Sequence, residues 1–266
     1  MGVVDDMTYT STNHKPLYLE SPVFRLLLEK QGPSLGLWRA AEVAALKEQS
    51  FPKPVLDLGC GDGLVTSLVL PEVEFGIDPD ETALERAGQL GIYQKVFAIP
   101  VERAPLAAGS IATILSNSVL EHIPNLDEVL SVAAQILRPG GRLIFTVPTE
   151  SFSDWLALPL SAYAAWRNRS YAHRNLWSVT AWNDHLMRAG LGLRTVRPYL
   201  RRQLVTSWDF LELLQMIWIA RRRLVGILWK RLPSWLMKNL AQRASGIDLS
   251  APAPGGGRLI VARKPL

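Results

Sequence analysis

A nine-residue stretch at positions 55–63 constrains the fold more than any other part of the sequence. It reads Val-Leu-Asp-Leu-Gly-Cys-Gly-Asp-Gly, and helix-forming residues follow from Leu64. Glycine allows the backbone to turn tightly and to approach a ligand closely. The first turn of the following helix offers unpaired N–H groups to a carboxylate or phosphate. The stretch therefore predicts a short strand, a turn and a helix that together hold an anionic or nucleotide-like ligand.

The spacing of the glycines separates two kinds of nucleotide site. The dinucleotide fingerprint needs a third glycine five positions after the first, and Leu64 stands there instead. The glycines lie at alternate positions, 59, 61 and 63. A second acid, Asp78, follows the next apolar run by one position and lies 21 residues after Asp57. An acid at the end of the second strand can accept both ribose hydroxyls of an adenosine ligand.

The rest of the chain alternates between strand and helix patterns, which predicts an α/β fold with a doubly wound, mainly parallel sheet. Strands are expected at 55–58, 73–77, 95–99, 111–116, 142–147, 193–199 and 258–262. Helices are expected at 22–29, 36–49, 64–70, 79–90, 126–137 and 179–189, and over 207–243 with a break near Pro233. Residues 151–177 are rich in aromatic side chains and have a looser pattern.

These motifs resemble the class I S-adenosylmethionine-dependent methyltransferases, especially the branch that acts on small molecules. The resemblance is close over residues 53–148 and weaker over 173–199 and the last strand. It implies a Rossmann-like sheet with strand order 3-2-1-4-5-7-6 and an antiparallel last strand. On this basis we expect a helical N-terminal extension over 1–52 and a methyltransferase domain over 53–266. A helical, basic insertion at 201–256 would precede the last strand.

The resemblance also assigns roles within an S-adenosylmethionine site. Asp57 and the loop around it would hold the methionine end of the cofactor, and Asp78 would hold the ribose. The residues expected to contact the cofactor are Asp57, Gly59, Cys60, Gly61, Gly63, Asp78, Val101, Glu102 and Asn117. Val101 and Glu102 would lie beside the adenine. Many relatives place an Asp at the position of Pro100, so Glu102 or backbone carbonyls would take over its contact with the adenine amino group.

Methyl transfer asks for an aligned acceptor and, for a hydroxyl or an acidic carbon, a base that removes a proton. His122 is the candidate base, because it follows the fourth strand and faces the transfer cleft in the family likeness. An imidazole titrates near neutral pH. The alternative is a residue that only lines the cleft or packs there. His173 and His185 are expected to be surface or packing residues. No Cys/His cluster has metal-ligand spacing, so no metal is expected.

The net charge of +5 is concentrated in one region. Residues 194–243 contain eleven basic and two acidic residues, a local net charge of +9. Four tryptophans, Trp208, Trp218, Trp229 and Trp235, lie in the 207–243 segment. This segment has three interpretations: a lid over the fold, a contact with an anionic membrane surface, or a nucleic-acid contact. Nucleic acid is the least favoured, because the apolar content exceeds what base stacking requires.

Other features limit where the chain works and what it does. Cys60 is the single cysteine, which excludes an intramolecular disulfide and favours a reducing cytoplasmic location. Arginines 221–223 divide the longest apolar runs, so none reaches the ~18–20 residues of a membrane span. The expected function is methyl transfer to a small or lipid-like acceptor at O, C or N. Two alternatives remain: an enzyme that uses the cofactor for other chemistry, and a non-catalytic binding or membrane-surface module on the same fold.

Overall fold

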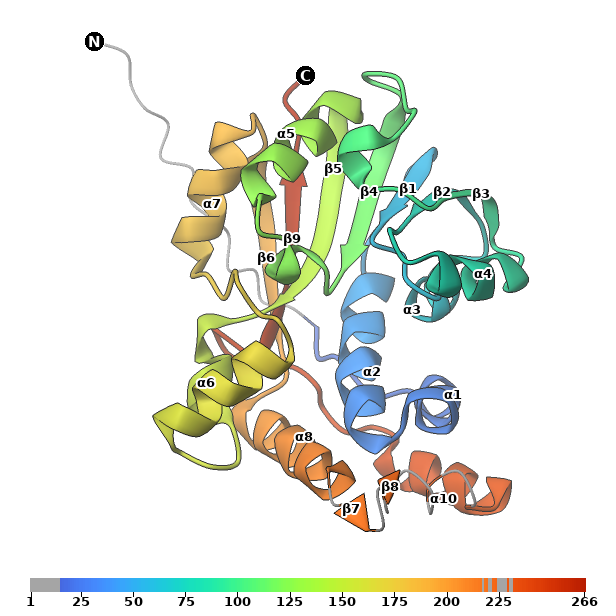
Figure 1. Ribbon diagram of the computed structural model, residues 1–266, viewed down its shortest axis with the longest axis vertical. Helices are drawn as coiled ribbons and strands as arrows, with labels where there is room; N and C mark the ends of the chain where they lie inside the picture. The colour runs from blue at the N-terminus through green and yellow to red at the C-terminus, as the bar shows by residue number, and fades with distance from the viewer. Residues whose placement is uncertain (1–14, 217, 220–221, 224–228, 230–231) are drawn as a thin grey trace.

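The computed structural model describes residues 15–216, 218–219, 222–223, 229 and 232–266. Its centre is a seven-stranded sheet in the order β3-β2-β1-β4-β5-β9-β6 (Figure 1). The strands are β1 (Val55–Leu58), β2 (Val73–Ile77), β3 (Tyr93–Phe97), β4 (Ile111–Asn117), β5 (Leu137–Pro148), β6 (Gly192–Tyr199) and β9 (Gly257–Arg263). β9 pairs antiparallel with both β5 and β6, and the other pairs are parallel. The predicted order 3-2-1-4-5-7-6 is confirmed.

Two apolar cores lie on the two faces of this sheet. On one face α5 (Leu126–Ile136) and α7 (Val179–Arg188) bury Leu130 and Trp182. On the other, α2 (Pro33–Lys47) and α3 (Leu64–Ser67) bury Leu46 and Val65. Every residue of β1 is buried, as expected for a central parallel strand covered on both faces. Its acid Asp57 is therefore held inside the protein and not at the surface. A further helix, α4 (Glu81–Gln89), joins β2 to β3.

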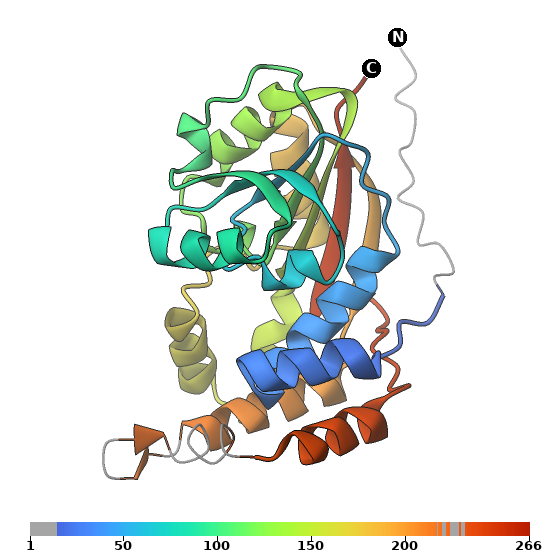
Figure 2. The same ribbon diagram turned by 90° about the vertical axis from the view of Figure 1, so that its right-hand side faces the viewer.

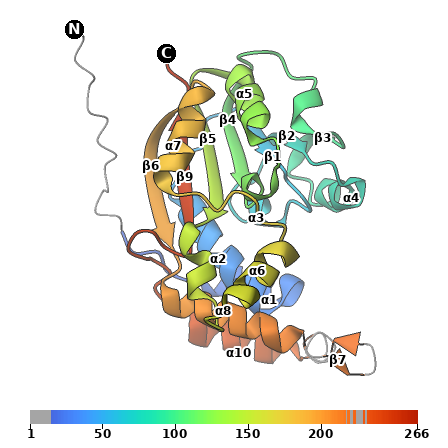
Figure 3. The same cartoon turned by 60° about the vertical axis from the view of Figure 1, so that its left-hand side comes forward.

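A layer of helices lies beneath the carboxyl ends of the parallel strands (Figures 1 and 2). It consists of α1 (Ser21–Gln31), α2, α6 (Ser161–Ser170), α8 (Arg202–Gln215) and α10 (Ser234–Ala244). In this layer α2 packs against α1 and α8, and α10 packs against α1. Figure 3 shows α8 running beneath α6 and α2. Ligands in open α/β sheets bind at the carboxyl ends of the strands, so this layer covers the edge where a site is expected.

The structure corrects two secondary-structure predictions. The 207–243 segment is not helical throughout, because Trp218–Ile219 (β7) and Arg222–Arg223 (β8) pair as a short antiparallel ribbon. Aromatic and β-branched residues favour such pairing. The fifth strand begins at Leu137, five residues before the prediction. The Pro-Gly-Gly turn at 139–141 bulges within the strand, helped by a φ of 72° at Gly140.

The N-terminal extension and the insertion do not stand apart from the sheet. Residues of α1, α2, α8 and α10 share one apolar core with residues of β4, β5 and β9. The division of the chain at residue 53 stays a prediction. Among the residues that the structure describes, no helix is both long and apolar enough to cross a membrane.

Candidate active site

The glycine-rich turn between β1 and α3 has two kinds of glycine. Gly59, Gly61 and Gly63 all have positive φ, at 71°, 53° and 73°. A Cβ on Gly59 would meet the Val119 side chain at 2.5 Å, whereas a Cβ on Gly61 would have nothing within 4 Å. Gly59 is thus required by packing inside the protein. Gly61 borders open space, where a branched side chain would fill room that a ligand needs.

The two predicted acids differ in their environment. Asp78 is half-buried, and its Oδ2 accepts the N–H of Gly61 at 2.9 Å while its Oδ1 accepts that of Asp80 at 2.9 Å. Asp57 is buried, and its Oδ2 accepts the hydroxyls of Thr66 and Tyr93, both at 2.6 Å. Burial raises the pKa of Asp57 to about 6, against the two hydroxyl donors, which lower it. Asp78 therefore offers an anchored carboxylate to a ligand, while Asp57 braces the turn.

A cleft of about 470 Å³ opens beside these groups. Its lining includes six of the predicted cofactor contacts, the predicted base and two further residues. The contacts are Asp57, Gly59, Cys60, Gly61, Asp78 and Asn117, the base is His122, and the further residues are Ser118 and Val119. Gln31 and Arg39 border it from the helical layer. The anchored Asp78 carboxylate fits the ribose hydroxyls of an adenosine cofactor. The open space at Gly61 leaves room for the part of the cofactor that lies against the turn.

Three predicted contacts do not line the cleft. Gly63 is the last residue of the turn, and a Cβ there would meet Tyr93 at 2.8 Å, so its role is in packing. Val101 is buried in the apolar core shared with α5. Glu102 is exposed. Both lie in the short helix Val101–Arg103. Their contact with adenine stays a prediction.

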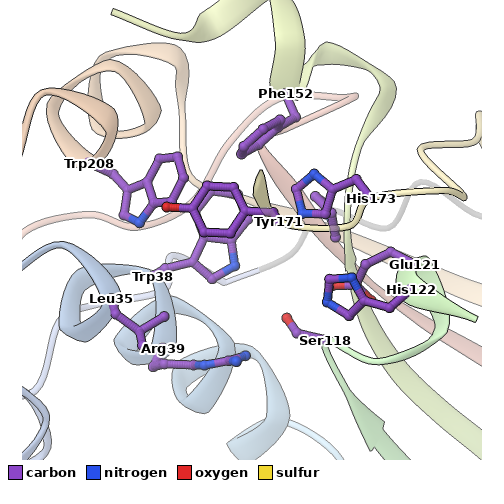
Figure 4. Close-up of a pocket in the computed structure, with 11 residues that line it drawn as sticks. Leu35, Trp38, Arg39, Ser118, Glu121, His122, Phe152, Tyr171, His173 and Trp208 are labelled. Carbon is purple, nitrogen blue, oxygen red and sulfur yellow. The ribbon is translucent and has the colours of Figure 1, made fainter. Parts of the chain in front are cut away.

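A second, smaller cavity of about 80 Å³ lies between the sheet edge and the helical layer (Figure 4). We call it the aromatic pocket, after the six aromatic rings in its wall: Trp38, His122, Phe152, Tyr171, His173 and Trp208. Their centroids are close, with 5.1 Å between Trp38 and Trp208, and 4.9 Å between Phe152 and His173. Such walls favour a flat, largely apolar ligand.

The two cavities share three residues. Arg39, Ser118 and His122 line both the cleft and the aromatic pocket. In Figure 4 these side chains lie on one side of the pocket, across from the rings of Phe152 and Trp208. A ligand in the aromatic pocket and a ligand in the cleft would therefore meet at this junction.

His122 is more accessible than Arg39, the other titratable group at the junction, and 39% of its side chain is exposed. Its Nδ1 lies 3.3 Å from the carbonyl oxygen of Ala172, and its ring stacks on His173 with centroids 5.6 Å apart. Burial lowers the pKa of His122, and it lowers the pKa of His173 to about 4. Both imidazoles are thus neutral at neutral pH, the state in which His122 can accept a proton.

Sequence reasoning missed the buried carboxylate of Glu42, which organises the junction from α2. Its Oε1 accepts the indole N–H of Trp38 at 2.9 Å and the hydroxyl of Ser118 at 2.5 Å. Its Oε2 accepts a guanidinium N–H of Arg39 at 2.7 Å and the amide of Asn117 at 3.0 Å. The available signal was an acid in the apolar helical run 40–46. Buried acids of this kind need several donors.

Glu121, next to the predicted base, was missed as well. It is 2% exposed, and its Oε1 lies 3.6 Å from Nε2 of His122. Its Oε2 has no hydrogen-bond partner within the described part of the chain. Burial raises the pKa of Glu121 to about 8. The pocket wall therefore holds a carboxyl group that is protonated at neutral pH.

Buried polar contacts fix the outer wall of the aromatic pocket. Arg167 of α6 and Asp209 of α8 form an ion pair in which neither side chain is exposed, with 2.6 Å between Nη2 and Oδ1. Asp209 also accepts the hydroxyl of Tyr163 at 2.7 Å. The Tyr171 hydroxyl donates to Glu212 of α8 at 2.8 Å, and Glu212 also accepts a hydrogen bond from Ser34 of α2. The wall of the pocket is therefore tied to three helices.

The remaining candidates lie outside this chemistry. His185 stacks on Trp177 with centroids 3.8 Å apart and does not line either cavity. Cys60 is buried, and burial raises its pKa, which leaves the thiol protonated and unreactive. Within the described ranges, no group of three or more His, Cys, Asp or Glu side chains could hold a metal ion.

Comparison with known proteins decides the family. Residues 36–196, more than half of the chain, match the model of the methyltransferase domain family. The chain belongs to the class I S-adenosylmethionine-dependent methyltransferases. Its cofactor is therefore S-adenosylmethionine.

Individual relatives are more distant. A ubiquinone biosynthesis O-methyltransferase of Escherichia coli is 29% identical over 119 residues, or 42% of this chain. The chain spans about half the length, 50%, of the curated relatives it matches. A methyltransferase structure from Thermotoga maritima is similar with a TM-score of 0.57 at 16% identity, covering 91% of this chain and 99% of that one. A phosphoethanolamine N-methyltransferase of Haemonchus contortus, solved with S-adenosylhomocysteine, gives a TM-score of 0.56 at 15% identity, covering 91% and 60%. Both structures show the shared fold.

Proposed function

We propose that this methyltransferase transfers a methyl group to a hydroxyl of a small or lipid-like acceptor whose flat ring occupies the aromatic pocket. The observation that carries this proposal is the junction of the two cavities at Arg39, Ser118 and His122. A methyl donor in the cleft and a ring in the pocket would meet there. Such alignment of donor and acceptor supplies much of the rate enhancement in a displacement reaction.

In the cleft, Asp78 would accept the ribose hydroxyls, and the backbone at Gly61 would lie against the methionine end of the cofactor. The anchored Asp78 carboxylate and the open space at Gly61 support these roles. Asp57 would keep the turn in place through Thr66 and Tyr93. The family likeness supplies the remaining assignment, which places Val101 and Glu102 beside the adenine.

The charge at the junction favours a hydroxyl over an amine as the acceptor. Burial opposes the charge of Arg39, but Glu42 outweighs it and the pKa of Arg39 is raised. The bound cofactor adds the positive charge of its sulfonium. A neutral amine gains positive charge as it is methylated, which both cations oppose, whereas the negative charge that develops on a reacting oxygen would be stabilised. The name of the Escherichia coli relative, an O-methyltransferase, agrees with this choice.

S-adenosylmethionine supplies a methyl group bound to a sulfonium, which is a good leaving group. The chain has to orient the acceptor and remove its proton. The rings of Trp38 and Trp208 would orient the acceptor, and Nε2 of His122 would take the hydroxyl proton. The proposal predicts that His122→Ala lowers turnover by about 100-fold or more, because general-base catalysis contributes about that much.

The test is transfer of labelled methyl groups from S-adenosylmethionine to a panel of phenols, matched anilines and a total lipid extract. Labelling of phenols with little labelling of anilines is expected. His122→Ala should bind S-adenosylhomocysteine normally in calorimetry while losing turnover. His185→Ala is the control, because His185 lines neither cavity. Labelling of anilines alone, or full turnover in His122→Ala, would contradict the proposal.

We propose in addition that α10 contacts an anionic membrane surface. Trp235 is 64% exposed, and Lys238 and Arg243 are exposed on the same helix, whose Met237 and Ala241 face the core. Trp208 lies in the pocket wall and Trp229 donates to the Leu28 carbonyl at 2.8 Å, so these two rings belong to a lid. Trp218 lies where no side chain is described. A cytoplasmic location with reversible membrane attachment stays a prediction.

Co-sedimentation with vesicles tests this contact. Anionic phosphatidylglycerol vesicles should bind the protein at low salt, and neutral phosphatidylcholine vesicles should not. High salt should release it, because charges are screened beyond about 8 Å at physiological ionic strength. Trp235→Ala should weaken binding, whereas Trp166→Ala, at an exposed ring on α6, should not. Equal binding to both vesicle types, or to neither, would exclude an electrostatic membrane contact.

A further inference from the structure

Both ring nitrogens of His122 face oxygen atoms. Nδ1 lies 3.3 Å from the Ala172 carbonyl, and Nε2 lies 3.6 Å from Oε1 of Glu121. A neutral imidazole carries only one N–H. With that hydrogen on Nδ1, directed at the carbonyl, the lone pair of Nε2 faces the carboxyl group of Glu121. This arrangement is favourable only when a proton lies between the two groups.

Among the described residues, Arg39 is the cation that lowers the pKa of Glu121, but burial outweighs it. The ionisable groups facing it are Arg39 and Glu42 from α2, Tyr199 from β6, His173 from the segment after α6, and His122. Arg39 is 2.7 Å from Glu42 and is already paired there. Tyr199 and His173 are neutral at neutral pH, since burial raises the pKa of the first and lowers that of the second. Among the described residues, His122 is therefore the neighbour that can share the proton of the Glu121 carboxyl group.

We propose that Glu121 and His122 hold one proton between them and act as a single proton-accepting pair, with Glu121 as the positioning residue beside Nε2 of His122. The role of this pair in catalysis rests on the proposed function. The more exposed imidazole meets the acceptor, and the buried carboxyl group lies beside the same nitrogen, Nε2, that takes the proton. The two groups titrate together, so the apparent pKa values belong to the pair.

The proton balance follows from this arrangement. Once the shared proton has left, Glu121 is a carboxylate and His122 is neutral. During transfer the oxygen of the acceptor forms a bond to the methyl carbon, and the sulfur–carbon bond breaks with its electron pair going to sulfur. The hydroxyl proton moves to Nε2, and the resulting imidazolium is paired with Oε1 of Glu121 on one side and the Ala172 carbonyl on the other. Turnover should therefore rise as the shared proton leaves, near pH 8, and not near pH 6.5.

Nitrogen NMR of the full chain, labelled with ¹⁵N-histidine and saturated with S-adenosylhomocysteine, tests the pair without any acceptor. The His122 resonances are assigned by their loss in His122→Gln. The Nε2 resonance of His122 should move with a midpoint near pH 8 in the wild type. This step should be absent in Glu121→Gln and retained in Glu128→Gln, whose residue is exposed on α5. Glu121→Asp, which keeps a carboxyl group, should retain a step.

A single step near pH 6 in both the wild type and Glu121→Gln would overturn the pair, because His122 would then titrate alone. A step near pH 8 that persists in Glu121→Gln would overturn it too. The kinetic arm uses whichever phenol of the panel is turned over. Glu121→Gln should lower kcat by at least tenfold and lose its rise toward pH 8, with KM for S-adenosylmethionine unchanged. If no acceptor is turned over, the proposed function fails. The NMR result still shows whether Glu121 and His122 share a proton.

Discussion

The cofactor cleft and the aromatic pocket adjoin, but the chain builds them in different ways. The cleft is made mainly from the turn after β1 and from the ends of β2 and β4, which are short local pieces of sequence. The pocket needs Trp38, Phe152, Tyr171 and Trp208, which come from four separate segments of the chain. The cleft is therefore specified locally, and the pocket exists only once the helical layer has packed.

The contacts that hold the two regions also differ. Backbone groups set the shape of the cleft, since Gly59 and Cys60 donate to the Ile77 carbonyl at 2.7 and 3.0 Å. Buried side-chain charges set the shape of the pocket, through Arg167 with Asp209 and through Glu42 with Arg39. Side chains can be exchanged without altering the sheet. This explains how one cofactor fold can serve different acceptors, and why the fold alone does not identify the acceptor.

The largest expected effect comes from breaking the ion pair behind the pocket. Asp209→Ala leaves the Arg167 guanidinium buried without its partner and removes acceptors from Tyr163 and from the Ala157 amide. Removing one partner of a buried pair costs about 3–5 kcal/mol. Urea unfolding should show a loss of that size. Asp154→Ala, at an exposed position in the same region, should change stability by less than about 0.5 kcal/mol.

The same variant separates the two regions. Asp209 does not line the cleft. At a temperature where the variant is folded, its affinity for S-adenosylhomocysteine should therefore stay within about twofold of wild type, a difference of about 0.4 kcal/mol. A parallel loss of cofactor affinity would show that cleft and pocket form one cooperative unit and would break the comparison.

The next effect is a pH dependence of stability at the junction. The pKa of Glu121 in the folded protein is about 8, above its ordinary value of 4.5. Between these values the folded state binds more protons than the unfolded state, so the free energy of unfolding falls as pH rises. The slope is about 1.4 kcal/mol per pH unit, or up to about 4 kcal/mol by pH 8. Glu121→Gln should remove this fall and be more stable than wild type at pH 8.

Unfolding curves at pH 5, 6, 7 and 8 measure this effect for both proteins. Glu128→Gln, at an exposed carboxylate, is expected to follow the wild type at every pH. If Glu121→Gln and wild type lose stability in parallel from pH 5 to pH 8, the carboxyl group is already ionised in the folded protein. That result would show that burial does not keep Glu121 protonated in the folded protein.

The cleft could be predicted from the sequence to a greater extent than the aromatic pocket. The alternation of strands and helices predicted all seven strands of the sheet, and the likeness to the family supplied their order. Glycines 59 and 61 and the acids at 57 and 78 come together as predicted because their positions depend on one turn and two adjacent parallel strands. Such short-range geometry is visible in the spacing of residues.

The pocket could not be predicted in this way. Trp38 and Trp208 meet at 5.1 Å although 170 positions separate them in the chain. The sequence pattern does not say which face of α8 turns inward, and aromatic residues in a basic segment fit both a lid and a membrane contact. Glu121 was passed over for the adjacent His122, because the burial that raises its pKa depends on packing from α2 and β6.

The smallest of the three effects tests the cleft itself. Asp78→Ala removes the carboxylate that is anchored by Gly61 and Asp80 and is proposed to hold the ribose. A hydrogen bond to a charged group contributes about 1.5–3 kcal/mol, so calorimetry should show S-adenosylmethionine binding weakened by more than about tenfold. Asp80→Ala is the matched control. The Asp80 side chain caps α4 through the Ala83 amide at 3.1 Å, so its loss should cost about 1 kcal/mol of stability and leave affinity unchanged. Unaltered affinity in a folded Asp78→Ala variant would remove the ribose assignment and leave the backbone of the turn as the main support of the cofactor.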